Sequence, residues 1–201
     1  MPGDNFATTS HPIGYGSDLP FNESYDIIVK NFKDAYIMKS NIILIGMPAA
    51  GKSTIGVLLA KTLLKSFVDT DLIIQSKYGS ALCNIIEKEG TDAFLKIEND
   101  IICSEVYHSS VVATGGSAVY GEDAMAHLRS DGIVVYLEIS LDEIKKRIGN
   151  ITTRGVAMKN GTTLDELYDE RLPLYNKYAD ITVKCEGKTA EEIVTEIVES
   201  L

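Results

Sequence analysis

Short apolar runs rich in β-branched residues alternate along this chain with longer segments that carry an apolar stripe. Apolar runs of this kind are typical of strands buried in a parallel sheet. They predict strands at residues 41–45, 66–71, 111–114, 133–137 and 181–183. The intervening segments predict helices at residues 55–64, 72–88 with a break near Gly79, 92–102, 141–148, 164–177 with an interruption at 171–175, and 190–201. This alternation implies a three-layer α/β sandwich, in which a five-stranded parallel sheet has helices on both faces.

Polar residues stand where several of these helices begin. Thr91, Ser140 and Thr189 each directly precede a predicted helix, where a hydroxyl can accept a hydrogen bond from a free backbone N–H group. Asp71 could cap a helix that starts at Leu72 in the same way. The Asp71 carboxylate could also take part in chemistry, an interpretation that depends on the glycine-rich motif at residues 46–54.

Residues 1–39 differ from the rest of the chain. They contain several glycines and prolines and show little periodicity before residues 25–36, which could form a short helix or an extra strand. We interpret residues 1–39 as an extension that drapes over the domain or is partly mobile. Residues 40–201 then form a single domain, which is an ordinary size for an α/β fold.

Composition and charge narrow the function further. The formal net charge of −10 argues against a nucleic-acid backbone or an anionic membrane as partner. No apolar run is long enough to span a membrane, and the N-terminus lacks a signal-peptide pattern. Three isolated cysteines without metal-ligand spacing fit a reducing compartment, so we expect a cytoplasmic protein. They are Cys83, Cys103 and Cys185.

Residues 46–54 fit the pattern G-x-x-x-x-G-K-[ST] between the first predicted strand and the first predicted helix. Gly46 and Gly51 let the backbone curl so that consecutive N–H groups point inward, and the helix N-terminus adds partial positive charge. Lys52 can then reach the β- and γ-phosphates of ATP, and the Ser53 hydroxyl can ligate Mg²⁺. A chance match is the alternative, and the flanking strand and helix argue against it. The candidate ATP-binding residues here are Gly46, Pro48, Ala49, Ala50, Gly51, Lys52, Ser53 and Thr54.

Two carboxylates end the second predicted strand. Ligands bind at the carboxyl ends of strands in a parallel sheet, so acids placed there can reach the phosphate site. Asp69 can hold the Mg²⁺ shell beside Ser53, and Asp71 can orient or deprotonate an acceptor hydroxyl. The alternative for Asp71 is a helix cap alone.

Glycines and an arginine add two further candidates. Gly115 and Gly116 follow the third predicted strand, where they allow the backbone to approach a ligand or simply form a tight turn. The polar segment 149–163 has the length of a lid. Its Arg154 could stabilise the charge of a phosphoryl group in transfer, or it could be a solvated loop arginine.

From Asn41 to the C-terminus these motifs, taken in order, resemble the shikimate kinase family of the nucleoside-monophosphate-kinase-like P-loop fold. The glycine loop resembles its Walker A segment, and Asp69-Thr70-Asp71 its D-x-D. Gly115-Gly116-Ser117 is similar to its triple glycine, and residues 171–175 to its R-x-P-L-Y.

The resemblance implies a kinase that uses ATP and Mg²⁺ and phosphorylates shikimate. In such an enzyme Asp69 serves the metal, while Asp71 contacts shikimate and acts as the base. Arg171 holds the shikimate carboxylate, supported by the backbone of Gly115 and Gly116. Arg147 and Arg154 are spaced like the family's adenine-stacking arginine and its lid arginine.

Three departures from the family pattern keep other functions open. Leu95 stands at the arginine of the family's F-R-x-x-E, Ser117 replaces the third glycine, and the lid reads Arg-Gly-Val-Ala from Arg154 where the family has R-P-L-L. The acceptor could therefore be another hydroxy acid or polyol. The chain could also be a nucleotide-binding module without turnover, although its paired acids argue for catalysis. We expect a monomer or weak dimer that meets a small-molecule acceptor.

Overall fold

The structure is a computed structural model that describes residues 39–148, 155–159 and 161–201. Residues 1–38 of the predicted extension lie outside this part of the chain. Arg154, the predicted lid arginine, also lies outside the described residues. The second compact unit of the chain, Met38–Leu201, contains every element named below.

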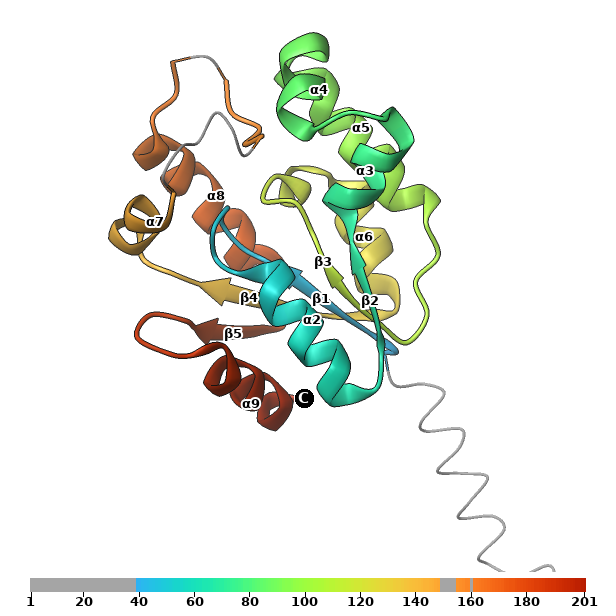
Figure 1. The fold of residues 1–201 in the computed structure, drawn as a ribbon, viewed down its shortest axis with the longest axis vertical. Coiled ribbons are helices and arrows are strands. Elements are labelled where there is room, and N and C mark those ends of the chain that lie inside the picture. Colours follow the sequence, from blue (N-terminus) through green and yellow to red (C-terminus); the bar gives the residue numbers. More distant parts are fainter. Residues whose placement is uncertain (1–38, 149–154, 160) are drawn as a thin grey trace, which may run out of the picture. The chain divides into compact units, whose positions relative to one another are not determined.

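Five parallel strands form the central sheet, as Figure 1 shows. In pairing order they are β2 (Ser66–Asp69), β3 (Ser110–Ala113), β1 (Asn41–Ile45), β4 (Gly132–Glu138) and β5 (Ile181–Lys184). Every residue of β1 is buried between its neighbours β3 and β4. That burial accounts for its uninterrupted apolar sequence. Because all strands are parallel, their carboxyl ends meet at one edge of the sheet.

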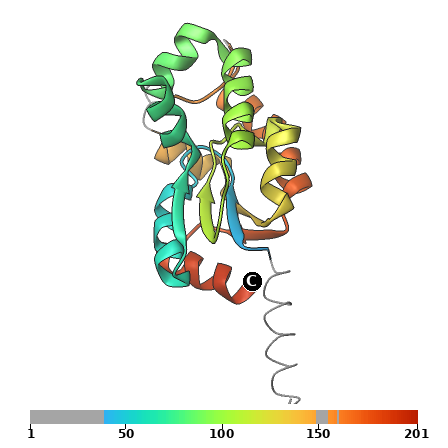
Figure 2. The ribbon, with the colours of Figure 1, turned by 90° about the vertical axis from the view of Figure 1, so that its right-hand side faces the viewer.

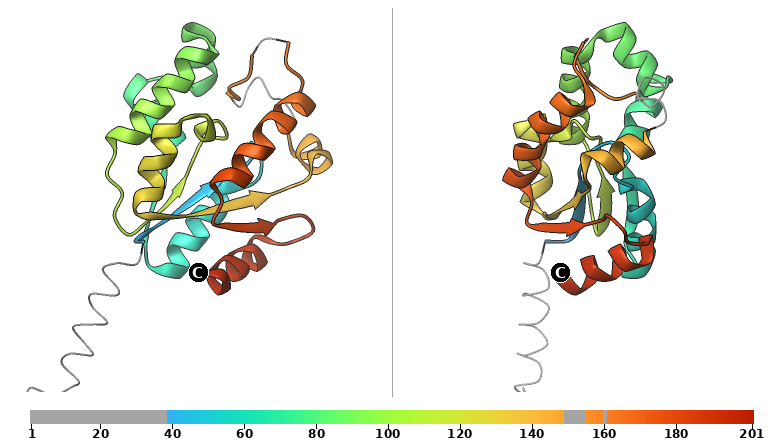
Figure 3. Two further views of the ribbon diagram at one scale, coloured as in Figure 1. Left: turned by 180° about the vertical axis from the view of Figure 1, so that it is seen from behind. Right: turned by 90° about the vertical axis from the view of Figure 1, so that its left-hand side faces the viewer.

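Helices cover both faces of the sheet, which confirms the predicted three-layer sandwich (Figures 2 and 3). On one face lie α2 (Lys52–Leu63) and α9 (Ala190–Ser200). On the other lie α6 (Glu122–Ser130) and α8 (Leu164–Tyr178), and α5 (Thr91–Ser104) packs against α6. The short helices η1 (Ala118–Tyr120) and α7 (Leu141–Arg147) complete the connections. The sequence placed every strand, but it did not locate α6.

A second apolar cluster lies beyond the carboxyl ends of the strands, separate from the main core. It is formed by α3 (Thr70–Tyr78), α4 (Leu82–Glu89) and α5, which gather at the upper right of Figure 1. Part of the lid segment joins it through Ala157. The buried members are Ile74, Leu82, Ile85, Phe94, Ile101 and Ala157. This cluster forms a wall beside the edge of the sheet where ligands bind in such folds.

The structure corrects the end of the second strand. β2 stops at Asp69, and α3 begins at Thr70 because the Asp69 side chain is the N-cap, accepting a hydrogen bond from the Asp71 backbone N–H group at 3.0 Å. The alternative that Asp71 caps a helix starting at Leu72 is therefore wrong. The break predicted near Gly79 is confirmed, since Gly79 ends α3 with a φ of 60°.

Two of the three predicted caps are confirmed and one is wrong. Ser140 and Thr189 accept hydrogen bonds from the third residues of α7 and α9. Thr91 is instead the first residue of α5 and follows the N-cap Gly90. Its hydroxyl donates to the carbonyl oxygen of Met158 at 2.9 Å, so it ties the lid segment to α5.

The interruption predicted within residues 171–175 does not exist, because α8 runs continuously through Pro173. A proline inside a helix costs about 3 kcal/mol. Two neighbours offset that cost through packing: Arg171 and Tyr175 are each only 1% exposed. Tertiary contacts outweigh local propensity here.

We predict that Ile74→Ala lowers the free energy of unfolding by about 2–4 kcal/mol, because it leaves a cavity in the second cluster. Ile74 is fully buried. Chemical denaturation measures the loss. Val57→Ala on the half-exposed face of α2 is the control and should cost less than about 0.5 kcal/mol. Equal losses for the two variants would contradict a packed second cluster.

Candidate active site

The loop between β1 and α2 has the curled backbone predicted for a phosphate site. Gly46, Ala49 and Gly51 all have positive φ, at 144°, 65° and 94°. Position 46 requires glycine, because a Cβ there would lie 2.8 Å from the Leu137 carbonyl oxygen. Gly51 is the N-cap of α2 and supplies no side-chain acceptor to the first turn. The first N–H groups of α2 are thus available to an anion.

Lys52 folds back over this loop. Its ammonium donates hydrogen bonds to the carbonyl oxygens of Gly46 at 2.7 Å and Met47 at 2.9 Å, and the side chain is only 9% exposed. Burial lowers the pKa of Lys52 to about 8, a shift that the charge of Asp71 partly opposes. Phosphate oxygens would give this buried cation a stronger, charge-assisted partner.

Ser53 and Asp69 form the predicted oxygen pair. The Ser53 hydroxyl donates to Asp69 Oδ2 at 2.7 Å, and Asp69 Oδ1 accepts the N–H group of Asp71. The carboxylate is therefore fixed on both sides. A hydroxyl and a carboxylate are hard oxygen ligands of the kind that Mg²⁺ prefers, so these two residues fit the ion.

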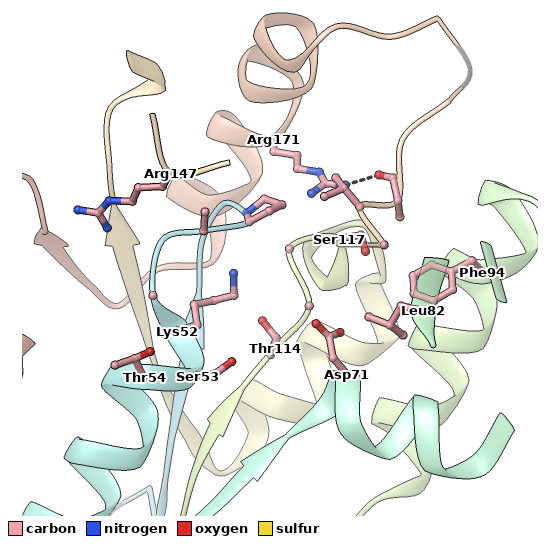
Figure 4. A pocket seen from close by; sticks show the side chains of 18 residues that line it. Lys52, Ser53, Thr54, Asp71, Leu82, Phe94, Thr114, Ser117, Arg147 and Arg171 are labelled. Carbon is pink, nitrogen blue, oxygen red and sulfur yellow. Dashed lines mark hydrogen bonds between the residues drawn. The ribbon is translucent and has the colours of Figure 1, made fainter. Parts of the chain in front are cut away.

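Asp71 points into the cavity from the first turn of α3 (Figure 4). Burial raises the pKa of its carboxyl to about 6, the nearby charge of Asp69 raises it further, and Lys52 opposes the shift. The helical position matters because it separates the two acids. Asp69 faces Ser53, whereas Asp71 faces the open space of the cavity.

The turn after β3 brings backbone close to charged groups. A Cβ on Gly115 would collide with Glu98 Oε1 and lie 2.8 Å from Asp71 Oδ1. A Cβ on Gly116 would lie 3.0 Å from an Arg171 guanidinium nitrogen. Both glycines therefore serve close approach as well as a turn, and both line the cavity.

Arg171 is anchored although it is almost fully buried. Its Nη2 donates to the Ala157 carbonyl oxygen at 2.6 Å, and its Nε donates to the Tyr120 hydroxyl at 3.3 Å. The guanidinium also lies 5.2 Å from the centre of the Tyr120 ring. Tyr120 was not foreseen from the sequence, because its contact comes from a separate part of the chain.

Arg147 lies on the other side of the phosphate loop. It ends α7, and its Nε donates to Glu143 Oε1 at 2.9 Å. Figure 4 places Arg147 on the left of Lys52, while Arg171, Asp71 and Ser117 lie on the right. The cavity thus has a phosphate-loop end and a second end with its own cation and acid.

The cavity has a volume of about 460 Å³. Sequence reasoning named most of its polar lining but omitted the apolar residues of the second end. Leu95 is not among the lining residues; it packs, partly buried, against the second cluster. The lining residues that were not predicted as site residues are Leu82, Phe94, Thr114, Ser117, Gly155, Val156 and Ala157. No helix in the described part of the chain is long and apolar enough to cross a membrane.

One cavity lined by a phosphate loop, by an acid in the first turn of α3 and by residues 155–157 of the lid segment defines a P-loop kinase of small molecules. Comparison with known proteins agrees. The family model described as shikimate kinase matches residues 48–201. A shikimate kinase of Francisella philomiragia is 39% identical over 165 residues, which cover 80% of this chain and 94% of the relative. The chain belongs to the shikimate kinase family and is an ATP-dependent phosphotransferase.

Two solved structures share the fold. The shikimate kinase of Acinetobacter baumannii in complex with shikimate has a TM-score of 0.73 and 30% identity, with 84% of this chain and 95% of that chain covered. The enzyme of Aquifex aeolicus has a TM-score of 0.68 and 33% identity, with 80% and 95% covered. These similarities extend over the domain that carries the cavity.

We predict that Lys52→Ala abolishes phosphoryl transfer, with turnover lowered at least about a thousandfold, because the loop loses the cation that reaches the phosphates. The fold should survive, since Lys52 bonds only to loop carbonyl groups. A steady-state ATP assay and a thermal melt measure the two effects. Lys61→Ala, exposed on the last turn of the same helix, is the control. Near-normal turnover of Lys52→Ala would refute a catalytic role for the loop.

Proposed function

We propose that this enzyme transfers the γ-phosphoryl group of ATP to a hydroxyl group of shikimate, giving shikimate 3-phosphate and ADP. The observation that carries the proposal is the pairing, within one cavity, of a phosphate loop with a buried cation and acid at the opposite end. A shikimate molecule offers both a carboxylate and a hydroxyl to such a pair. Family membership supports the same acceptor.

At the nucleotide end, we assign the phosphates to the loop N–H groups and Lys52, and the stacking of the adenine base to the guanidinium of Arg147. We assign Mg²⁺ to Ser53 and Asp69, which would hold the ion through a hydroxyl and a carboxylate oxygen. Such an ion would supply neutralisation of the negative charge on the phosphates. Arg154 remains the proposed lid cation.

At the acceptor end, we assign the carboxylate to Arg171, whose guanidinium lines the cavity. Asp71 accepts the hydrogen of the reacting hydroxyl. As the hydroxyl oxygen bonds to the γ-phosphorus, the bond to the β-phosphate oxygen breaks, and the proton passes to Asp71. Lys52, at the phosphate-loop end, stabilises the charge that develops on the transferred group.

The proposal extends to the partners, the cellular compartment and the oligomeric state of the enzyme. Its substrates are small molecules, and the net charge of −10 disfavours nucleic acid as a partner. We propose a cytoplasmic enzyme that acts as a monomer or weak dimer, with residues 40–201 as the catalytic domain.

A second candidate acceptor is another hydroxy acid or polyol. Apolar Leu82 and Phe94 in the lining favour it, together with Leu95 beside them. ATP consumption measured across a panel of hydroxyl acceptors distinguishes the candidates. Consumption with shikimate alone supports the proposal, consumption with another acceptor alone favours the second candidate, and none with any acceptor indicates a binding module.

We predict separable effects for the two acids. Asp71→Asn should lower turnover about a hundredfold or more with ATP affinity little changed, because the acceptor hydroxyl loses its base. Asp69→Asn should raise the Mg²⁺ concentration needed for half-maximal rate, and asparagine still caps α3. Metal titrations and steady-state kinetics measure both effects. Asp92→Asn, exposed on α5, controls for loss of a carboxylate. Unchanged turnover in Asp71→Asn would remove Asp71 from the chemistry.

We predict that Leu95→Arg lowers the KM for shikimate about tenfold or more, through a charge-assisted pair with the carboxylate. Leu95→Met is the uncharged control of similar volume. If wild type turns over shikimate efficiently and arginine brings no gain, position 95 does not contact the acceptor. If arginine damages the activity on another acceptor and creates activity on shikimate, the second candidate is correct.

A further inference from the structure

Glu98 is a buried carboxyl with an unusual contact set. It lies on α5, is 1% exposed, and accepts a hydrogen bond from the Ser117 hydroxyl through Oε2 at 2.6 Å. Its other oxygen, Oε1, is buried and has no hydrogen-bond partner among the described residues. Buried carboxylate oxygens are normally satisfied, so this atom requires an explanation.

The unpartnered oxygen lies directly beneath the acceptor end of the cavity. A Cβ on Gly115 would meet both Glu98 Oε1 and Asp71 Oδ1, so the two carboxyls are neighbours across that glycine. Gly115 and Ser117 line the cavity, while Glu98 stands behind them. A charge on Glu98 would therefore act on whatever binds over this turn.

No cation is paired with Glu98 in the described part of the chain. Its charged neighbours are Asp71 on α3, Lys52 on α2 and Arg171 on α8. Lys52 bonds to the loop carbonyls, and Arg171 to Ala157 and Tyr120. One turn earlier on α5, at the spacing where a side chain could reach Glu98, stands the apolar Leu95.

We propose that Glu98 sets the affinity of the cavity for an anionic acceptor: its protonated form admits a carboxylate, and its ionised form repels one. Ser117 holds the carboxyl in place beneath the turn. This inference rests on the proposed function and deepens it, because it names the residue that makes acceptor binding depend on a proton. Glu98 does not touch the acceptor. It acts from behind the Gly115–Ser117 turn through the electrostatic field of its carboxylate, and is therefore a positioning residue.

The pH at which the Glu98 carboxyl loses its proton follows from the groups around it. Burial raises the pKa of Glu98 to about 7, and Asp71 adds to that rise, whereas the Ser117 hydrogen bond and the charges of Arg171 and Lys52 oppose it. The protonated form therefore dominates below neutral pH and the ionised form above it. Because the folded protein holds this proton more tightly than the unfolded chain, the carboxyl also lowers stability as pH rises from about 4.5 to about 7.

The test compares wild type with Glu98→Gln, which keeps an acceptor for Ser117 and removes the charge. At saturating ATP, the wild-type KM for shikimate should rise about tenfold between about pH 6 and about pH 8.5, whereas the KM of Glu98→Gln stays level; kcat, which Asp71 and Lys52 govern, should follow the same course in both enzymes. The uncharged amide of shikimate should show no such rise with wild type. Asp100→Asn, exposed on the same helix, should behave as wild type.

A second variant tests the direction of the effect. Ser117→Ala removes the hydrogen bond that lowers the pKa of Glu98, so the rise in KM should move to higher pH. Melting temperatures without substrate give an independent readout, in which Glu98→Gln should gain on wild type as pH rises from about 5 to about 8.

Each outcome decides one claim. A melting-temperature difference that is constant with pH, or a KM that follows the same course in wild type and Glu98→Gln, overturns the role of Glu98. A rise in KM for the amide as large as for shikimate also overturns it, since charge repulsion would then not be the cause. Failure to phosphorylate shikimate at any pH overturns the proposed function instead. In that case the melting temperatures still test the titration, and their shift on adding shikimate tests repulsion of the anion.

Discussion

The structure depends on keeping ionisable side chains of opposite charge buried together in the cavity when no substrate is bound. Lys52, Glu98 and Arg171 are each less than a tenth exposed, and Asp71 lies among them. Burying separate charges is expensive, and mutual attraction with hydrogen bonds must offset it. Backbone carbonyl groups satisfy both cations here. They hold the cations at the two ends of one cavity, where anionic substrate groups can replace weaker neutral partners.

Much of this arrangement could be predicted from the sequence because it is local. The phosphate loop, the strand before it and the helix after it are contiguous, and every strand was placed within a few residues. Parallel strands bring their carboxyl ends together, so the order of motifs alone put Asp69, Asp71 and Gly115 near Lys52. The resemblance to a family supplied Arg171, whose position on α8 carries no local pattern of its own.

The remaining features come from contacts between distant segments. Tyr120 and Ala157 anchor Arg171 across long stretches of chain, and Ser117 meets Glu98 from another element. Local rules also fail where packing overrides them, as in the helix that continues through Pro173. In the sequence, Glu98 stands out only as the glutamate that ends the family's F-R-x-x-E pattern. Its buried oxygen, which has no hydrogen-bond partner in the described part of the chain, becomes evident when three helices and the glycine turn are assembled.

The lid segment is attached by its main chain. Thr91 and Arg171 both bond to carbonyl oxygens, those of Met158 and Ala157, and every amino acid carries that acceptor. These two hydrogen bonds therefore do not depend on which side chains residues 157 and 158 carry. The lid of this enzyme departs from the family pattern without losing its docking points. The attachment of the lid thus depends on the side chains of Thr91 on α5 and Arg171 on α8 and not on those of the lid residues that they bind.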